Sequence, residues 1–461
     1  MNIRTVKHIN LYQKKNVQQG FNLKKNHNNE PVKIIDNNIQ KILNYPKEKK
    51  ILNTNKKNEK PQKRNCSSLK SNNNKIYQQN NNKTSNDSLN SKKIEQSKIR
   101  SESNFDRRRS NNIEKPSNGK FTNGTIGLIN IGNTCYLNSA IQNLKNVHLL
   151  TKYLLSKHKN YIPNSFTLKY CELIANLINQ DTYKYYEPRN FFSKLNELIP
   201  TFRFGQQNDS NFCIIYILNL LEKGTTKDSD NNFCKRDKII LKDELEKLRF
   251  ANFQEKLYKR RNSPIVEYFY GYQEDIYKCK NCEYSNYTFQ AISVLNLSIM
   301  KKDNTVIDNL NDAIKYYQME QSHDNEQDFF CPECQKNKIF TQSKIISFPK
   351  ILIINLKRIG ENNFYDHNVD YPPKLEVSNY SYELIGYIKH KGGANSGHNI
   401  AVCKNFFDNH WYVYNDNIVY PLIKENTETQ NSFLFFYQKV EERINDTDKE
   451  FIINESAKLR I

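Results

Sequence analysis

The feature that most constrains this chain is the segment from Gly124 to Leu144, GTIGLINIGNTCYLNSAIQNL, in which a cysteine follows a turn and opens a helical pattern. The run Gly132–Thr134 supplies turn and helix-capping residues. Apolar residues then recur at helical spacing, at Leu137, Ala140, Ile141 and Leu144. Cys135 is therefore predicted at, or just before, the first turn of a helix that packs on its apolar face.

A cysteine in this position has two interpretations. A helix N-terminus lowers the pKa of a thiol and so favours the nucleophilic thiolate. Asn130, five residues upstream, carries an amide that can donate to the oxyanion of an acyl-transfer intermediate. The other interpretation is a small buried cysteine in a core helix, the common environment of a free cysteine. The segment alone leaves both open.

The positive charge of the chain is concentrated in its first quarter. Residues 1–122 contain 28 Lys and Arg against 9 Asp and Glu, whereas the remaining residues contain 42 against 40. The first segment is rich in Asn, Lys, Ser and Gln and poor in aromatic residues, so we expect a disordered tail. Its basic clusters, Lys56–Arg64 and Arg107–Arg109, fit a solvated tail, a nuclear-localisation signal, or a weak contact with nucleic acid or a membrane.

The sequence also bounds the cellular setting. No run approaches the ~20 apolar residues of a membrane span, and the N-terminus lacks the apolar region of a signal peptide. Ten cysteines in such a chain favour a reducing compartment, and metal or catalytic roles for the thiols. We therefore expect a protein of the cytoplasm, the nucleus or both, with no membrane association, and a monomer.

Helical patterns are followed along the chain by strand patterns, which predicts one α+β domain over residues 123–440 with a cleft between its halves. The expected helices are Tyr136–Leu155, Phe166–Ile178, Asn190–Leu198 and Asp209–Leu221. The expected strands are Tyr268–Lys278, Thr288–Ile299, Lys344–Lys357, Tyr382–His390, Asn399–Lys404, Trp411–Tyr414 and Phe433–Lys439. A short charged tail, residues 441–461, with either a short helix or no regular structure, is expected after this domain.

Two CxxC pairs, separated by 48 residues, have the spacing of zinc knuckles. They are Cys279 with Cys282 and Cys331 with Cys334. Together the four thiolates complete a tetrahedral site for one Zn²⁺, which would be structural because no coordination position stays open. Disulfides and metal-free cysteine pairs are the alternatives.

His398 is the candidate base for a thiol nucleophile. It follows a glycine-rich loop, Gly392–Gly397, which permits close approach of an extended ligand. Two adjacent antiparallel strands would bring Asn415 or Asp416 beside the imidazole, where either can accept a hydrogen bond and orient the ring. On spacing alone, the pattern favours a histidine with a structural role over a catalytic one.

Taken together, these segments resemble the ubiquitin-specific protease family of deubiquitinating enzymes. The cysteine segment GLINIGNTCYLNSAIQNL and the histidine segment SGHNIAVCKN…WYVYNDNIV are similar to the paired catalytic boxes of that family. Between and after them, in the family's order, come FGQQNDSNF, the two CxxC pairs, KILIINLKRI, YELIGYIKHKGG and SFLFFYQKV. The resemblance covers about Thr122 to Val440.

The resemblance implies a papain-like cysteine peptidase with a helical thumb, a β-rich palm and zinc-bearing β fingers at about residues 267–345. It implies ubiquitin and ubiquitinated proteins as partners, with hydrolysis after the C-terminal Gly-Gly of ubiquitin and no catalytic cofactor. By position, Cys135 is the nucleophile, His398 the general base and acid, and Asn415 the orienting residue. Asn130 then matches the oxyanion-hole residue, and Asp416 assists the histidine or a water.

Three positions depart from the family pattern. Asn208 and Asn211 stand where the family's Gln-Gln-Asp box has Asp and Glu, and Asn399 replaces the Tyr that follows the catalytic His. These substitutions concern the channel for the substrate tail. They leave two alternatives to an active deubiquitinase, namely an inactive ubiquitin-binding scaffold and a protease for another ubiquitin-like modifier.

Overall fold

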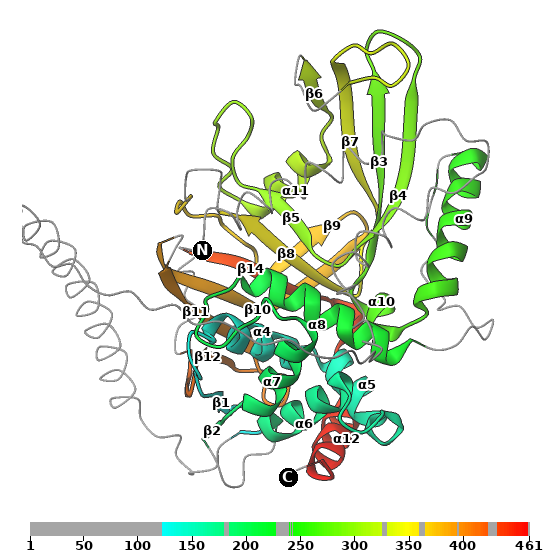
Figure 1. Cartoon of the computed structure of the whole chain (residues 1–461). Coiled ribbons are helices and arrows are strands. Elements are labelled where there is room, and N and C mark those ends of the chain that lie inside the picture. The colour runs from blue at the N-terminus through cyan, green and yellow to red at the C-terminus, as the bar shows by residue number, and fades with distance from the viewer. Residues whose placement is uncertain are drawn as a thin grey trace, which may run out of the picture. The chain divides into compact units, whose positions relative to one another are not determined.

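The computed structural model describes residues 122–178, 184–226, 239, 241, 243–324, 330–358, 365–393, 396–422 and 431–459. The tail predicted over residues 1–122 lies, apart from Thr122, outside the described residues. Within the described part, helices come first along the chain and strands follow (Figure 1). This order confirms the expected α+β class.

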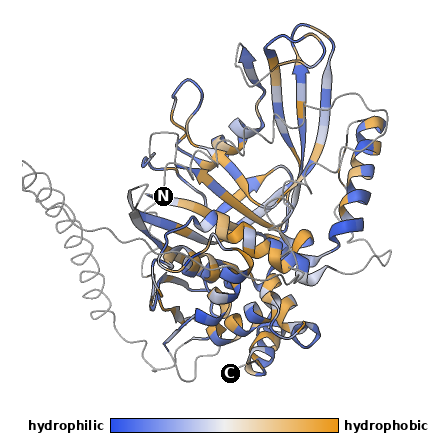
Figure 2. Ribbon diagram, in the orientation of Figure 1, coloured by the Kyte–Doolittle hydropathy of each residue, from blue (hydrophilic) through white to orange (hydrophobic). Residues whose placement is uncertain are grey.

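Helices dominate the first part of the described chain. They are α4 (Cys135–Asn146), α5 (His148–Ser156), α6 (Phe166–Ile178), α7 (Arg189–Leu198), α8 (Ser210–Thr225), α9 (Glu244–Arg261) and α10 (Pro264–Phe269). Helix α4 is central, because all of its residues are buried. Hydrophobic residues gather in the region where α4 and α8 meet the strands (Figure 2).

An eight-stranded sheet backs these helices, in the order β13-β12-β11-β10-β14-β8-β5, with β9 paired to β10 outside that order. The strands are β5 (Leu295–Ser298), β8 (Ile351–Lys357), β9 (Lys374–Val377), β10 (Tyr380–Gly393), β11 (Ser396–Lys404), β12 (Trp411–Asn415), β13 (Ile418–Pro421) and β14 (Ser432–Lys439). Both faces of its middle are buried: Ile353 belongs to the core shared with the helices, whereas Leu352 and Ile354 belong to a second core. This explains the uninterrupted apolar run of β8.

The second core lies on the far face of the sheet and is closed by helix α11 (Leu310–Gln318). Leu310, Ala313 and Ile314 of α11 are buried in it. Their spacing of three and four residues gives the helix one apolar face. This short helix was not expected from the sequence.

A four-stranded sheet, in the order β4-β3-β7-β6, extends away from the eight-stranded sheet (Figure 1). Its strands are β3 (Gly271–Cys279), β4 (Ser285–Ile292), β6 (Gln321–Asp324) and β7 (Lys338–Ser347). Helix α9 lies alongside β4 and is fixed by an ion pair, in which Arg249 Nη2 lies 3.3 Å from Oε1 of the buried Glu274. These strands occupy the region predicted as fingers.

Several boundaries differ from the expectation. The strand expected from Tyr268 begins instead at Gly271, because Ser263 caps and Pro264 starts helix α10. The helix expected over Tyr136–Leu155 is two helices, α4 and α5, divided at Val147. The two long strands expected over 288–299 and 344–357 are each interrupted, giving β4 and β5, and β7 and β8.

Buried polar side chains of α4 hold the segment that precedes the helix. Asn138, Gln142 and Lys145 share one face of α4, since they lie four and three residues apart. Their side-chain nitrogens donate to the backbone carbonyls of Leu128, Ile126 and Gly124, respectively. Burial lowers the pKa of Lys145 to about 8.

The segment expected as a charged tail contains a helix that packs on the domain. Helix α12 (Asp446–Ala457) lies against α5 and α6. Asn445 caps it by accepting from the backbone N–H of Asp448, whose carboxylate lies 2.6 Å from Lys152 Nζ on α5. Ile452 is fully buried in the core shared with the other helices.

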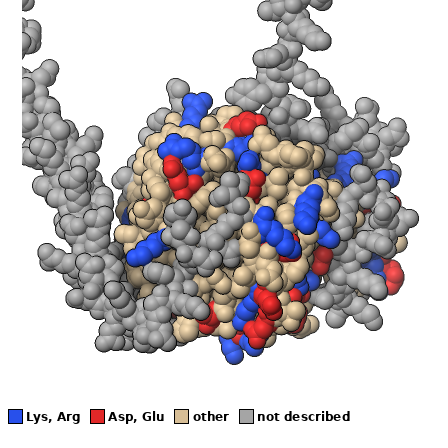
Figure 3. Space-filling model, turned by 90° about the horizontal axis from the view of Figure 1, so that it is seen from below, with Lys and Arg blue, Asp and Glu red and all other residues tan. Residues whose placement is uncertain are grey.

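The surface of the described residues carries mixed charge. On the face seen in Figure 3, Lys and Arg side chains alternate with Asp and Glu, in keeping with the nearly balanced charge after residue 122. Among the described residues, no helix has the length and apolar character needed to cross a membrane.

The buried position of Ile452 gives a test of the packing of α12. We expect Ile452→Ala to lower the free energy of unfolding by about 2–5 kcal/mol, through lost apolar contact and a residual cavity. The matched control is Ile162→Ala, at a side chain 76% exposed, which should change stability by less than ~0.5 kcal/mol. Urea denaturation of the two variants checks this, and similar losses in both would contradict the packing of α12.

Candidate active site and cysteine cluster

Cys135 is the first residue of α4, as the sequence predicts, and is 5% exposed. The loop before it turns sharply, with φ of +110° at Gly132 and +54° at Asn133. Asn133 Nδ2 donates to the carbonyl of Gly205, and the Gly205 N–H donates to the carbonyl of Gly132. The loop is therefore held by the segment before α8. Its conformation places the thiol at the positive end of the helix dipole.

Thr134, expected to cap α4, acts differently. It occupies the cap position, but its side chain makes no capping hydrogen bond to the helix. Its hydroxyl instead accepts from the backbone N–H of Ile131, and its own N–H donates to Oδ1 of Asn130. Thr134 thus stabilises the turn and not the first helical N–H groups.

His398 and Asn415 lie on the adjacent antiparallel strands β11 and β12. Nε2 of His398 is 2.6 Å from Oδ1 of Asn415. Since the amide oxygen can only accept, Nε2 carries the proton in this pair. The other imidazole nitrogen is then the one available to the thiol. The structure brings these two predicted residues together with Cys135, whose side chain interacts with His398.

The environment of His398 favours its charged form. Burial by itself lowers the pKa of this imidazole, but hydrogen bonding to the side chains of Cys135 and Asn415 raises it. The charges of Cys135 and Asp416 act in the same direction, and the pKa of His398 rises to about 9. Hydrogen bonding and neighbouring negative charge together therefore outweigh desolvation at this position.

Asp416 connects the segment before Cys135 to the eight-stranded sheet that carries His398. It is the first residue of the two-residue turn between β12 and β13 and has a φ of +51°. Its carboxylate accepts from Nδ2 of Asn130 at 2.9 Å and from Nδ2 of Asn138 at 2.8 Å. Its carbonyl accepts from the N–H of Leu128, and Oδ2 lies 3.9 Å from Nε2 of His398.

Asn130 is oriented from both ends of its amide. Oδ1 accepts from the backbone N–H groups of Gly132 and Thr134, each at 3.1 Å, while Nδ2 donates to Asp416. The amide is thereby fixed in the turn before Cys135. Asn138 was not predicted as a site residue, and its position on the polar face of α4 is the signal that could have identified it.

The three departures from the family pattern each have a structural partner. Asn208 bonds locally, to the Thr201 carbonyl and the Asp209 N–H. Asn211 Nδ2 donates at 3.3 Å to Oδ1 of Asn296, which also accepts from Asn355. Asp209 caps α8 by accepting from the N–H of Asn211.

Asn399 is buried and bonds to His390 and Ser210. Its side-chain amide is therefore directed at these polar partners. Gln207 of the same FGQQ segment donates to the carbonyl of Gly397, immediately before His398.

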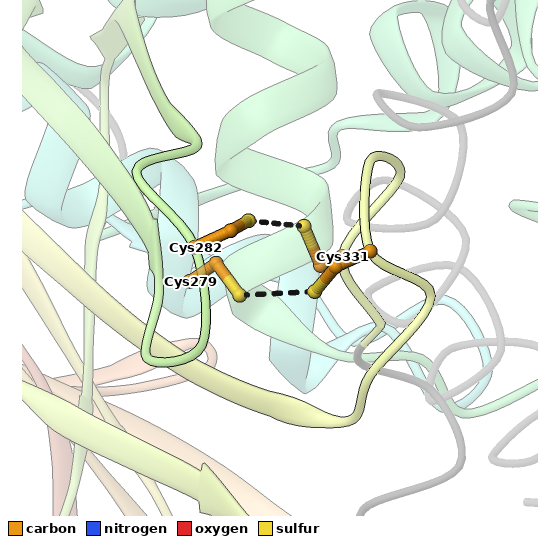
Figure 4. A group of neighbouring side chains, drawn as sticks. Cys279, Cys282 and Cys331 are labelled. Carbon is orange, nitrogen blue, oxygen red and sulfur yellow. Dashed lines mark hydrogen bonds between the residues drawn. The ribbon is translucent and has the colours of Figure 1, made fainter.

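The four cysteines of the CxxC pairs lie together at one end of the finger strands (Figure 4). Their sulfur atoms are all within 4.8 Å of one another. Sγ of Cys279 is 3.6 Å from that of Cys334, and Sγ of Cys282 is 3.6 Å from that of Cys331. These are free thiols at nonbonded separations, far beyond the ~2.05 Å of a disulfide. The cluster could hold one metal ion.

The cluster has unequal thiols. Burial raises the pKa of Cys279, but backbone N–H groups of Asn281 and Cys282 and the neighbouring thiols lower it to about 7. Burial dominates at Cys331 and raises its pKa to about 12. The pKa of Cys279 therefore lies below that of Cys331.

Comparison with known proteins places this geometry in a family. The family model described as "Ubiquitin carboxyl-terminal hydrolase" matches residues 126–437. Ubiquitin carboxyl-terminal hydrolase 2 of Bos taurus is 25% identical over 342 residues, covering 70% of this chain and 56% of that protein. Ubiquitin carboxyl-terminal hydrolase 21 of Homo sapiens is 26% identical over 355 residues, covering 69% and 62%. The chain thus spans little more than half the length of these relatives.

Solved structures support the fold. The SAGA Ubp8/Sgf11/Sus1/Sgf73 DUB module bound to ubiquitin aldehyde contains a chain similar to this one, with a TM-score of 0.53, 22% identity and 70% coverage of each chain. The Ubp8-Sgf11-Sgf73-Sus1 SAGA DUB module gives a TM-score of 0.52 at 22% identity, covering 69% of this chain and 68% of that one. The papain-like fold expected from the resemblance is confirmed, and the chain belongs to the ubiquitin carboxyl-terminal hydrolase family.

Proposed function

We propose that this protein is a deubiquitinating thiol peptidase that hydrolyses the peptide or isopeptide bond after the C-terminal Gly-Gly of ubiquitin. The observation that carries the proposal is the convergence of Cys135, at the N-terminus of α4, with His398 and Asn415 on adjacent strands. Membership of the family and the names of the relatives support ubiquitin as the substrate. Ubiquitin and ubiquitinated proteins are then the partners.

The reaction begins with transfer of the Cys135 proton to His398, through the imidazole nitrogen that is not bonded to Asn415. The thiolate attacks the carbonyl carbon of the terminal glycine, and the C–N bond breaks as His398 returns the proton to the leaving amine. His398 then takes a proton from water, which attacks the thioester. This step releases the ubiquitin carboxylate and restores the Cys135 thiol. Asn415 keeps the ring oriented throughout.

Asn130 is the proposed oxyanion donor, together with the backbone N–H of Cys135. Preorganised donors of this kind contribute most when they need no rearrangement during the reaction. The contacts of Asn130 with Gly132, Thr134 and Asp416 support that role, because they fix the amide before substrate binds. Asp416 then acts on the histidine and on Asn130 at once, as an electrostatic and positioning group.

Zn²⁺ is the ion we assign to the cysteine cluster. A tetrahedral ion with Zn–S bonds of about 2.3 Å requires sulfur atoms about 3.8 Å apart. The two closest contacts, of 3.6 Å, are near this value, and all four sulfur atoms lie within 4.8 Å of one another. The residues that would hold it are Cys279, Cys282, Cys331 and Cys334, and the ion would pin β3 to the segment before β7. Its role would be structural.

The first test uses ubiquitin that carries a thiol-reactive electrophile at its C-terminus. We expect a covalent adduct with the wild-type chain and none with Cys135→Ala, detected by intact mass. Cys213→Ala, which alters a buried cysteine of α8, is the matched control and should label normally. Ubiquitin binding without an adduct would instead favour the inactive scaffold, and adducts only with another modifier would change the substrate.

The metal assignment is tested by elemental analysis of the purified full chain. We expect about one zinc per chain, and loss of that zinc in Cys331→Ser, because a site with three thiolates binds more weakly. Cys213→Ala should keep its zinc. A folded wild-type protein without zinc, or unchanged zinc in Cys331→Ser, would contradict the assignment.

The raised pKa of His398 gives a third test. Cys135→Ala removes the cause that raises this pKa most, so NMR titration should show it fall from about 9 toward the ordinary value of about 6.5. The raised value also means that the charged imidazole stabilises the folded state below about pH 6.5. This contribution is lost as the pH rises through about 9. Denaturation of the two proteins across this range should show that difference, and an unchanged His398 titration would refute the pairing.

A further inference from the structure

A second histidine, His390, lies against both residues that flank His398 in sequence. His390 lies on β10 directly opposite Asn399 on β11. An imidazole nitrogen, Nδ1, is 2.8 Å from Oδ1 of Asn399. The ring also lies over Gly397, where a Cβ atom would come within 2.3 Å of it. Only glycine therefore fits at this position, and His390 constrains the backbone on both sides of His398.

Asn399 also connects to α4, the helix that begins with Cys135, through hydrogen bonds. Its Nδ2 donates to Oγ of Ser210, which in turn donates to the carbonyl of Tyr136, at 3.1 and 3.0 Å. Tyr136 directly follows Cys135 in α4. Asn399 and Ser210 are both buried. The hydrogen bonds thus run in one direction, from His390 through Asn399 and Ser210 to the backbone beside the nucleophile.

The hydrogen bonds of this path require a side chain at position 399 that both accepts and donates. The group at position 399 must accept from an imidazole N–H and donate to a hydroxyl, and a carboxamide does both. A carboxylate could accept from His390 but could not donate to Ser210. The amide orientation is the one that satisfies both partners. Asn399 is thus specified by its neighbours, which accounts for its departure from the family pattern.

We propose that His390, Asn399 and Ser210 form a positioning relay that fixes His398 relative to Cys135. This inference rests on the proposed function, because it assigns the relay to the same reaction. The relay residues do not touch the reacting atoms, so they act through the geometry of the Cys135–His398 pair. Displacements of about 1 Å in such a pair typically cost up to ~100-fold in rate.

The test measures alkylation of Cys135 by iodoacetamide between pH 5 and 9, with the labelled residue identified by peptide mass spectrometry. This small electrophile reports the thiolate–imidazolium pair without requiring ubiquitin. We expect Asn399→Leu and His390→Phe each to slow alkylation at pH 6 by roughly 10- to 100-fold, and to move the rise in rate to higher pH. The double variant should be no slower than either single variant, because the residues act as one unit.

Two further variants separate positioning from general stability. His390→Gln retains an N–H donor and should restore most of the wild-type alkylation profile. Tyr412→Phe is the matched control, since it removes one hydrogen bond from the same sheet, to Asp408, and should leave the profile unchanged. Ser210→Ala, which removes a single hydroxyl, replaces any variant that fails to fold.

Unchanged alkylation profiles in the relay variants, with only a lower melting temperature, would overturn the relay. So would additive losses in the double variant. Normal alkylation of wild-type Cys135 together with failure to label with the ubiquitin electrophile would count against the proposed substrate alone. The two proposals therefore fail in different ways.

Discussion

The active-site geometry depends on the carboxylate of Asp416. It accepts hydrogen bonds from Asn130, in the turn before the nucleophile, and from Asn138, one turn into α4. These partners lie 286 and 278 residues away along the chain. This contact sets the register of the edge formed by β12 and β13 against the cysteine segment, together with the bond from the Leu128 N–H to the Asp416 carbonyl. A charged acceptor with two amide donors makes the joint strong and directional.

Helix α4, which carries Asn138, is buried on every side. A helix surrounded by protein must satisfy its polar side chains internally. The side-chain nitrogens of Asn138, Gln142 and Lys145 do so by donating to three alternate carbonyls of the preceding segment. Gly127 in that segment approaches the β12–β13 turn so closely that a Cβ atom would meet the backbone of Asn417. The nucleophile is therefore positioned by close packing and hydrogen bonds together.

Local patterns were enough to predict much of this arrangement. The turn and helical spacing placed Cys135 at the start of a helix, and the CxxC spacing located the cysteine cluster. Glycine content and strand spacing made His398 a candidate beside Asn415 or Asp416, and the family resemblance decided between these alternatives. Contacts between distant segments could not be read in this way. The relay through Asn399 and the two amide partners of Asp416 depend on which strands become neighbours. Helix α11 was missed because its nine residues give too short a period to stand out.

Strand β14 lies between β10 and β8 in the middle of the eight-stranded sheet, although residues 432–439 come after every other strand in the described chain. A ribosome would therefore release the cysteine helix and the histidine hairpin before the strand that unites the sheet. Non-local pairing of this kind is slow and leaves strand edges unpaired until it is complete. The arrangement of Cys135 and His398 would therefore be complete only once β14 has been synthesised and has paired with β10 and β8.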